Sequence, residues 1–372
     1  MRILQVITSL KIGGAEHIVV HLVKLLRQKG HEVDVVVFNG DETSFTNELK
    51  ATGCKIFNLG HGFYDLRYIG RLRKVMRDYD IIHTHNSSPQ LFAAIANIGL
   101  GKVLVTTEHN TDNRKRHCWA MAKIDRWMYK KYDRIITISN QAETNLRQYL
   151  SNSSNHPALG RIVTILNGVD VSSIYRAKAY QDGDLRDEHG EVVSISEVVN
   201  IIQVAAFRPQ KDQKTLIDAL QYLDEKYVVW IVGDGELREE LHNYAASSAH
   251  RNRIFFFGNR NDVPRLLKTA DIVCMSTHYE GLSLSNIEGM CAGKPFIASD
   301  VEGIHEVTAG YGILFPHGNA EALAGIIRQL HDDPVYYREV AMRCHERALQ
   351  YDIKKMVDGY EQVYIELSNH EV

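Results

Sequence analysis

Short β-type runs alternate with helical patterns along almost the whole chain. The first half contains six such runs: Arg2–Ile7, Glu32–Phe38, Lys55–Leu59, Asp80–His83, Lys102–Thr106 and Arg134–Ser139. Apolar residues with helical spacing fill the intervals, as in residues 15–29, where Ile18 and Leu22 fall on one face. Regular alternation of strands and helices predicts a parallel sheet that is covered by helices on both faces.

The alternation stops in a polar, charged stretch at residues 175–194 and then begins again. Six further β-type runs follow: Val198–Val204, Tyr227–Val232, Arg253–Phe257, Asp271–Ser276, Pro295–Ser299 and Gly312–Phe315. A chain of 372 residues is long enough for two domains, each with its own core. We therefore predict an α/β protein with two doubly wound domains, residues 1–168 and 169–351, and we assign the polar stretch to the surface between them.

The corner after the run Asp271–Ser276 has the features of an anion-binding site. A helix is expected from about Ser285 to Ala292, so the preceding loop presents unpaired backbone N–H groups and a positive helix end. Glu280 in the loop and Glu288 in the helix flank this corner. Carboxylates bind hydroxyl groups well, so the two glutamates suit a ligand with hydroxyl-rich groups on both sides of an anion, such as a nucleotide sugar.

The segment from Glu280 to Glu288 reads Glu-Gly-Leu-Ser-Leu-Ser-Asn-Ile-Glu and is followed by Gly-Met-Cys-Ala-Gly-Lys-Pro. It resembles the two-glutamate motif of retaining glycosyltransferases of the GT-B fold, family 4. The resemblance implies that Glu280 contacts the donor sugar and that Glu288 contacts the ribose of the nucleotide. Taken alone, the segment also fits an ordinary helix N-terminus that favours acidic residues, with Gly281 turning the chain.

Four more motifs resemble this family and occur in the family's order. They are the glycine loop at Gly13 and Gly14, the histidine His109, the pair Arg208 and Lys211, and the loop at Asn259. Each motif follows an expected strand, which is where parallel α/β sheets bind ligands. The glycine loop lacks the G-x-G-x-x-G spacing, so a dinucleotide-binding fold is disfavoured. This chain has Ala206 where the family usually has glycine, so the backbone conformation at that corner cannot be inferred from the family.

The resemblance assigns a role to each motif. Arg208 and Lys211 would stabilise the negative charge that develops on the departing diphosphate, together with backbone N–H groups after Glu280. Those backbone groups belong to Gly281, Leu282, Ser283 and Leu284. His109 and the glycine loop would lie beside the transferred sugar, and the loop at Asn259 would bracket the base. No general base is evident, in keeping with the front-face mechanism proposed for the family, in which the leaving phosphate takes the acceptor proton.

The resemblance also implies the arrangement of the chain. In the GT-B fold two Rossmann-like domains face a cleft, the first binds the acceptor and the second binds the donor, and the last helix crosses back to the first domain. The tail of this chain has a matching helical pattern, with one apolar stripe formed by Met356, Tyr360, Val363, Tyr364 and Leu367. We therefore add residues 352–372 to the first domain.

We predict a retaining glycosyltransferase of the hexosyltransferase type. It would move a sugar from a nucleotide-sugar donor to a hydroxyl group of a glycan or lipid-linked acceptor, in the biosynthesis of a surface polysaccharide or glycoconjugate. Two alternatives stay open, namely another GT-B enzyme such as a nucleotide-sugar epimerase or hydrolase, and a catalytically silent nucleotide-sugar-binding protein. The complete sets of two glutamates and two cations argue against the silent protein.

We expect no metal and no other cofactor. Two cations and a helix N-terminus already cover the diphosphate, and the five cysteines have no metal-ligand spacing. Asp182-Gly-Asp184 has the Asp-x-Asp pattern of metal-dependent glycosyltransferases, but it follows no strand. We also expect His83 and His85 to point to opposite faces of a strand and therefore not to share an ion.

The charge is unevenly distributed. Residues 1–165 hold 23 basic and 14 acidic residues, whereas residues 166–372 hold 20 and 32. Residues 114–134 contain eight basic residues among the apolar side chains of Trp119, Met121, Ile124, Trp127 and Met128. This composition fits either a solvated helix face or a surface that docks on anionic lipid, and we predict the latter. We expect a cytoplasmic protein, peripheral at the inner face of the membrane, with no nucleic-acid partner and no apolar run of the roughly 18 residues that span a bilayer.

Overall fold

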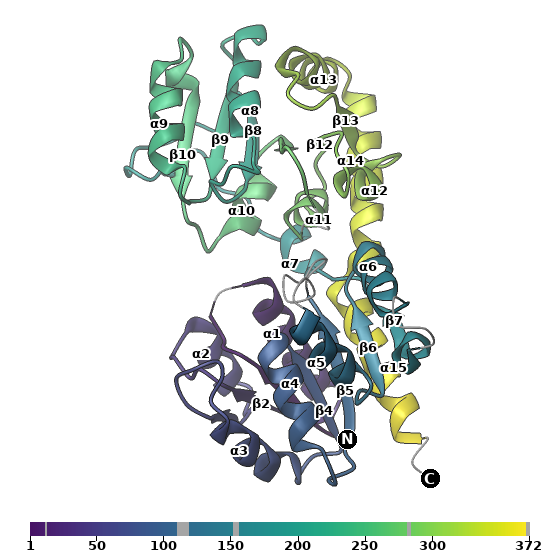
Figure 1. The fold of residues 1–372 in the computed structure, drawn as a ribbon. Helices are drawn as coiled ribbons and strands as arrows, with labels where there is room; N and C mark the ends of the chain where they lie inside the picture. The colour runs from purple at the N-terminus through teal and green to yellow at the C-terminus, as the bar shows by residue number, and fades with distance from the viewer. Residues whose placement is uncertain (12, 110–118, 152–155, 281–283, 370–372) are drawn as a thin grey trace. The chain divides into compact units, whose positions relative to one another are not determined.

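The computed structural model describes residues 1–11, 13–109, 119–151, 156–280 and 284–369. The chain forms two compact units, one made of Met1–Gly168 with Ile353–Val372 and the other of Val169–Asp352. Each unit contains one parallel sheet, and helices cover both faces of each sheet (Figure 1). The prediction of two doubly wound, Rossmann-like domains is confirmed.

The first unit has a seven-stranded sheet in the order β3-β2-β1-β4-β5-β6-β7. Its strands are β1 (Arg2–Ile7), β2 (Glu32–Val37), β3 (Ile56–Asn58), β4 (Ile81–His85), β5 (Val103–Glu108), β6 (Arg134–Thr137) and β7 (Ile162–Thr164). Its helices are α1 (Gly14–Gln28), α2 (Ser44–Lys50), α3 (Arg67–Met76), α4 (Ser87–Ala96), α5 (Trp119–Tyr129), α6 (Asn140–Ser151) and α15 (Ile353–Asn369). All six runs expected in this half form strands, and β7 is the strand that the sequence pattern missed.

Apolar side chains form a core on each face of the first sheet. Helices α1, α2 and α15 contribute to one core, in which Ile18 and Leu22 belong to the same cluster as Tyr360 and Tyr364. Helices α3, α4, α5 and α6 contribute to the other core. The strands between these cores are buried on both sides, and their apolar residues point to both faces of the sheet.

The last helix, α15, belongs to the first unit. The five residues of its predicted apolar stripe are all buried: Met356, Tyr360, Val363, Tyr364 and Leu367. Gly168 lies against the start of this helix, where a Cβ atom would come within 2.8 Å of the Cα atom of Ile353. A side chain at position 168 would therefore push the helix start away, so the glycine is needed for this packing.

The second unit has a six-stranded sheet in the order β10-β9-β8-β11-β12-β13. Its strands are β8 (Val199–Val204), β9 (Tyr227–Val232), β10 (Ile254–Gly258), β11 (Ile272–Met275), β12 (Phe296–Ser299) and β13 (Ile313–Phe315). Its helices are α7 (Val171–Tyr175), α8 (Gln213–Ala219), α9 (Arg238–Ser247), α10 (Val263–Thr269), α11 (Leu284–Cys291), α12 (Ile304–Thr308), α13 (Ala320–Asp332) and α14 (Pro334–Ala348). All six runs expected in this half form strands.

The polar stretch at residues 175–194 belongs to the second unit. Leu185 and Val193 are buried in the core of that unit, and Arg186 and Val192 pair as an antiparallel bridge. The assignment of this stretch to the surface between the domains is therefore wrong for its apolar residues. Single apolar residues in a charged segment show no helical or strand periodicity, so their burial could not be predicted from the sequence.

Candidate functional site

Each sheet has one point at which the strand order reverses. In the first sheet this point lies between β1 and β4, and in the second it lies between β8 and β11. Beyond the carboxyl ends of two such strands the connections diverge and leave the crevice in which open α/β sheets bind ligands. The candidates that follow these strands are Gly13 and Gly14 after β1, Arg208 and Lys211 after β8, and Glu280 after β11. The predicted residues therefore lie at the reversal point of their own sheet.

Backbone hydrogen bonds join the two loops of the second reversal point. The N–H group of Asp212 donates to the carbonyl oxygen of Ser276 (3.1 Å), and that of His278 donates to the carbonyl oxygen of Gln210 (2.9 Å). These bonds fasten the loop after β8 to the loop after β11. Lys211 lies between the bonded positions, so its side chain emerges from a braced corner.

Lys211 and Glu280 form an ion pair within this corner. The Nζ atom of Lys211 bonds to Oε1 of Glu280, and Nε2 of Gln210 donates to the same oxygen (3.0 Å). The side chains of Lys211 and Glu280 are only 10% and 8% exposed. Arg208, by contrast, is exposed and makes no side-chain hydrogen bond or ion pair with the described residues. The corner thus holds one neutralised cation and one cation that is free to meet an anion.

Glu288 lies one turn into α11 and faces a poorly solvated environment. Burial raises the pKa of its carboxyl group. Within the described part of the chain it has no hydrogen-bond or ion-pair partner. The adjacent Gly289 packs against the ring of Phe296, where a Cβ atom would come within 2.6 Å, so this glycine lets α11 lie close to β12. A ligand hydroxyl that donates a hydrogen bond to such a desolvated carboxylate stabilises it, and this favours binding of the ligand.

The structure describes only some of the other residues that are predicted to contact the nucleotide-sugar donor. Leu284 is the first residue of α11, so its backbone belongs to the helix N-terminus. Gly281, Leu282 and Ser283 lie outside the described residues. Asn259 is exposed and directly follows β10, at the same edge of the sheet as Lys211, because all six strands are parallel. The expected base-binding loop is therefore at the ligand-binding edge.

Two further glycines shape this edge, and the family motifs did not identify them. A Cβ atom at Gly233, where φ is 140°, would lie 2.1 Å from the carbonyl oxygen of Ala205. One at Gly235 would lie 2.4 Å from the carbonyl oxygen of Phe207. The signal in the sequence was the Gly-Asp-Gly triplet directly after β9. Ala206 does not have a positive φ, so the alanine fits this corner without strain.

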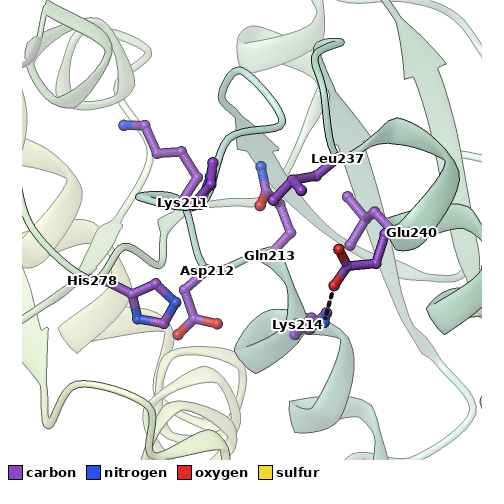
Figure 2. A pocket seen from close by; sticks show the side chains of 9 residues that line it. Lys211, Asp212, Gln213, Lys214, Leu237, Glu240 and His278 are labelled. Atoms are coloured by element: carbon purple, nitrogen blue, oxygen red, sulfur yellow. Dashed lines mark hydrogen bonds and ion pairs between the residues drawn. The ribbon is translucent and has the colours of Figure 1, made fainter.

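A pocket of about 340 Å³ opens beside Lys211 at the start of α8 (Figure 2). Its wall includes His278 from the loop after β11, and Glu240 from α9, which is bonded to Lys214 (2.7 Å). The pocket therefore extends from the loops at the reversal point to α9. Its mixture of charged groups and the side chain of Leu237 suits a small polar ligand.

Asp212, His278 and His317 come together from three loops of the second unit, with one ligand atom of each within 4.8 Å of the others. The imidazoles of His278 and His317 bond to each other (2.7 Å). Asp212 caps α8 by accepting from the backbone N–H (3.2 Å) and the hydroxyl (2.6 Å) of Thr215. Both carboxylate oxygens of Asp212 and one ring nitrogen of each histidine thus have protein partners, so the proximity of these side chains alone does not require an ion.

Asp182 closes a turn in the segment before β8. Its Oδ1 atom accepts from the backbone N–H of Ile195 (2.8 Å), and its Oδ2 atom accepts from the hydroxyl of Ser196 (2.7 Å). These hydrogen bonds, that from Ile195 first, lower the pKa of Asp182. The Asp182-Gly-Asp184 pattern therefore has a structural explanation as a turn.

In the first unit, α1 begins directly after the predicted glycine loop. The carboxylate of Glu16 folds back over Gly13, where a Cβ atom would lie 2.3 Å from Oε2 of Glu16. Gly14 has open space around its Cα atom. Gly13 is therefore needed for the contact with Glu16, whereas Gly14 keeps the helix N-terminus accessible to a ligand. Burial raises the pKa of Glu16.

His109 is partly exposed and directly follows β5. Its Nε2 atom lies 2.9 Å from Nδ1 of His85, at the carboxyl end of β4. Desolvation lowers the pKa of His109 to about 4. His83 and His85 lie on one face of β4, with ring centroids 4.2 Å apart. The expectation of opposite faces is wrong, because residues i and i+2 of a strand share a face.

The face of the first sheet that carries α3, α4 and α5 has exposed apolar side chains. Leu66, just before α3, is 74% exposed, and Trp119, at the start of α5, is 73% exposed. Ile124 on α5 is also exposed, whereas Met128 is buried in the core and does not contribute to this surface. Among the described residues, no helix has both the length and the apolar character that a membrane span needs.

Two family models together match most of the chain. Residues 12–173 match the model described as Glycosyltransferase Family 4, and residues 186–351 match the model described as Glycosyl transferases group 1. The chain belongs to the family 4 glycosyltransferases. The membership predicted from the two-glutamate motif is confirmed.

Individual relatives of this glycosyltransferase have low sequence identity to it. The UDP-Gal:alpha-D-GlcNAc-diphosphoundecaprenol alpha-1,3-galactosyltransferase of Escherichia coli is 26% identical over 320 residues, which cover 82% of this chain and 80% of that one. The N-acetyl-alpha-D-glucosaminyl L-malate synthase of Bacillus anthracis is 24% identical over 376 residues, covering 96% and 94%. Anabaena Alr3699/HepE, solved in complex with UDP, matches with a TM-score of 0.80 at 22% identity, covering 99% and 100% of the two chains. The structural match confirms the GT-B fold.

Proposed function

We propose that this glycosyltransferase moves a hexose from a UDP-sugar to an acceptor hydroxyl with retention of configuration at the transferred carbon. The observation that carries the proposal is the corner where Lys211 and Glu280 are paired beside the free cation Arg208. UDP as the nucleotide is supported by HepE, which was solved with UDP-glucose, and by the E. coli relative, whose name specifies UDP-Gal.

The ion pair gives the donor a specific path into the site. A diphosphate attracts Arg208 first, because this cation has no partner among the described residues to release. Lys211 then exchanges the carboxylate of Glu280 for a phosphate oxygen. The released carboxylate accepts hydrogen bonds from sugar hydroxyls, so phosphate binding and sugar binding depend on each other. Negative charge that grows on the diphosphate during transfer is stabilised by both cations and by the N-terminus of α11.

The acceptor proton goes to the leaving phosphate in this mechanism. A general base works best when its pKa lies near the working pH. Desolvation lowers the pKa of His109 to about 4, which makes its imidazole a weak base at neutral pH. His109 instead serves as a neutral hydrogen-bonding group beside the transferred sugar. The charge on the diphosphate is met by protein cations, so we propose that transfer does not depend on a metal ion.

We also propose a lipid-linked acceptor and docking of the first unit on anionic membranes. The E. coli relative acts by name on a diphosphoundecaprenol, which is a lipid diphosphate. Exposed Trp119 and Ile124 on α5 accompany the basic residues Lys123 and Lys130. Aromatic side chains beside cations suit an anionic lipid surface. Arg114, Lys115 and Arg116, which contributed to the prediction, lie outside the described residues.

A panel of nucleotide sugars tests the donor and the reaction. The true donor should raise the melting temperature most, since a ligand of the native state stabilises it by mass action. With that donor, free UDP should form at full rate only when an acceptor is present, and excess chelator should leave the rate unchanged. Proton NMR of the product should show the anomeric configuration of the donor. Release of free sugar, conversion to another nucleotide sugar, or an inverted product would contradict the proposal.

A further inference from the structure

A buried chain of polar side chains lies between the first sheet and α15. Its members are Gln5 on β1, His83 and His85 on β4, Thr107 on β5, and Tyr360 and Tyr364 on α15. None of these six residues is exposed. A buried polar group without a partner is costly, so each hydrogen bond in the chain restricts the proton positions of its neighbours.

The direction of the hydrogen bonds can be followed from Gln5 to His109. Oε1 of Gln5 lies 2.7 Å from Nε2 of His85, and an amide oxygen only accepts, so this nitrogen carries a proton. Burial lowers the pKa of His85 well below its ordinary value, so the ring is neutral and its Nδ1 is an acceptor. Nε2 of His109 lies 2.9 Å from that atom and therefore donates. His109 is neutral as well, which leaves a lone pair on its Nδ1.

The direction of the other arm follows from the same orientation of the Gln5 amide. Nε2 of Gln5 donates to the hydroxyl of Tyr364 (3.4 Å), and this hydroxyl donates to Nδ1 of His83 (2.6 Å). Nε2 of His83, whose pKa burial also lowers, donates to the hydroxyl of Thr107 (2.8 Å). Each of these hydrogen bonds thus pairs one donor with one acceptor. A half-turn of the Gln5 amide would reverse each of these bonds, so the orientation of one amide decides the proton positions of both arms.

We propose that His85, Gln5 and Tyr364 are positioning residues that hold His109 as the Nε2–H tautomer. The proposal rests on the proposed role of His109 beside the transferred sugar. In this tautomer the free Nδ1 accepts a hydrogen bond from a hydroxyl group of the donor sugar or of the acceptor. In the other tautomer the same atom would present a proton and could not accept. The last helix therefore acts on the site of the first unit through the hydroxyl of Tyr364.

Nitrogen NMR of the full-length protein, labelled with ¹⁵N at histidine, reads the tautomer directly, because protonated and unprotonated ring nitrogens differ in chemical shift. The signals of His109 are those lost in His109→Gln. We expect a protonated Nε2 in the wild type. Tyr364→Phe leaves the Gln5 amide without its outer partner, so we expect a mixture of tautomers. An Nδ1–H tautomer in the wild type, or an unchanged tautomer in Tyr364→Phe, would overturn the proposal.

Tyr79→Phe is the matched control. The hydroxyl of Tyr79 donates to Oδ2 of Asp34 (2.7 Å) and is buried in the same unit, but it has no bond to the chain described above. The control removes one buried hydroxyl, as Tyr364→Phe does. We expect both variants to lose stability and only Tyr364→Phe to change the tautomer of His109 and the turnover number. Equal effects of the two variants on turnover would show that general destabilisation is the cause.

Substitutions of His85 separate positioning from packing. His85→Asn keeps an acceptor near the place of Nδ1, whereas His85→Phe keeps the volume and no hydrogen bond. We expect kcat to fall roughly tenfold or more in His85→Phe, with little change in the KM of the donor, and to recover in part in His85→Asn. A kcat of His85→Phe that is higher than that of His85→Asn would mean that only the packing of this side chain matters. If the tautomer is as proposed but His109→Gln transfers at the wild-type rate, the positioning stands and the proposed role of His109 fails.

Discussion

Nζ of Lys211 is paired with Oε1 of Glu280, although 69 residues separate the two in the chain. The pair lies at the reversal point of the second sheet, and Gln210 donates to the same carboxylate oxygen (3.0 Å). A cation and an anion of the proposed donor site therefore satisfy each other. Any ligand that binds there has to offer better partners to both, and this requirement favours a molecule with an anion next to hydroxyl groups.

Glu280→Gln should separate the two functions of this pair. The variant removes the negative charge that competes for Lys211, so UDP alone should bind more tightly, by up to about tenfold. Transfer should nevertheless fall, because a neutral amide holds the sugar hydroxyls less strongly than a carboxylate. Calorimetry with UDP and initial rates with the intact donor measure the two effects. Weaker UDP binding by this variant would show that the pair does not compete with the diphosphate.

Lys211→Ala should lower kcat more than it raises the donor KM, since the charge that we propose Lys211 stabilises grows in the transition state. One lost charge-assisted contact is worth roughly 1.5–3 kcal/mol, or about one to two decades in rate. Lys226→Ala is the control, because Lys226 lies over the ring of Tyr227 at the opposite end of β9. Near-normal turnover by the double variant Arg208→Ala/Lys211→Ala would reduce both residues to ordinary surface cations.

Glu288→Gln should make the free protein more stable at neutral pH and weaken donor binding. Burial raises the pKa of Glu288 above 4.5, so the folded protein favours the protonated carboxyl group. The ionised form therefore costs stability, and this cost grows as the pH rises from 4.5 through the raised pKa and then stays constant. Replacement by glutamine removes the cost, so the variant's advantage should vanish at pH 4, grow as the pH rises above 4.5, and reach its full size above the raised pKa.

Denaturant unfolding of wild type and Glu288→Gln across this pH range measures the difference. Glu339→Gln on the exposed side of α14 is the matched control and should show no such trend. A stability difference that is independent of pH would mean that the carboxyl group of Glu288 is not desolvated. An unchanged affinity for UDP would argue against its contact with the ribose.

The fold could be predicted because the strands are buried on both faces and stand out as apolar runs. All six residues of β9, for example, are buried. The missed strand β7 has three residues and lies at the edge of its sheet, so it carries too little pattern to be recognised. Leu185 and Val193 were missed for a related reason, since each is a single buried residue within a charged segment.

The positions of the candidate residues could be predicted, but their partners could not. A strand end places a residue at the ligand-binding edge, and this is a local property of the sequence. The partner depends on strand order, which brings Gln5 to His85 across 80 residues and Asp212 to His317 across a longer interval. Sequence spacing contains neither relationship. The hydrogen bond between His85 and His109 was not predicted either. The incorrect expectation that His83 and His85 lie on opposite faces gave no reason to place the three histidines together.

The first unit should dock reversibly on anionic membranes through α5 and its surroundings. Attraction of about 1 kcal/mol per basic residue near the surface makes such binding fall steeply with salt. Exposed Trp119, over whose ring Nζ of Lys123 lies at 4.4 Å, adds an apolar anchor. Co-sedimentation with vesicles that contain phosphatidylserine, at low and at high salt, measures the binding. We expect the protein to pellet at low salt and to be released at high salt.

A charge-matched pair of variants tests which surface is responsible for docking. Lys123→Glu/Lys130→Glu reverses two charges on or next to α5, whereas Lys50→Glu/Lys355→Glu reverses two on helices α2 and α15, which contribute to the core of the opposite face of the sheet. Only the first variant should lose vesicle binding, and Trp119→Ser should weaken binding at low salt because it removes an apolar contact. Equal loss in both double variants would mean that net charge alone drives binding. If the wild type does not pellet with anionic vesicles at low salt, a water-soluble acceptor, such as the L-malate in the name of the B. anthracis relative, becomes the better hypothesis.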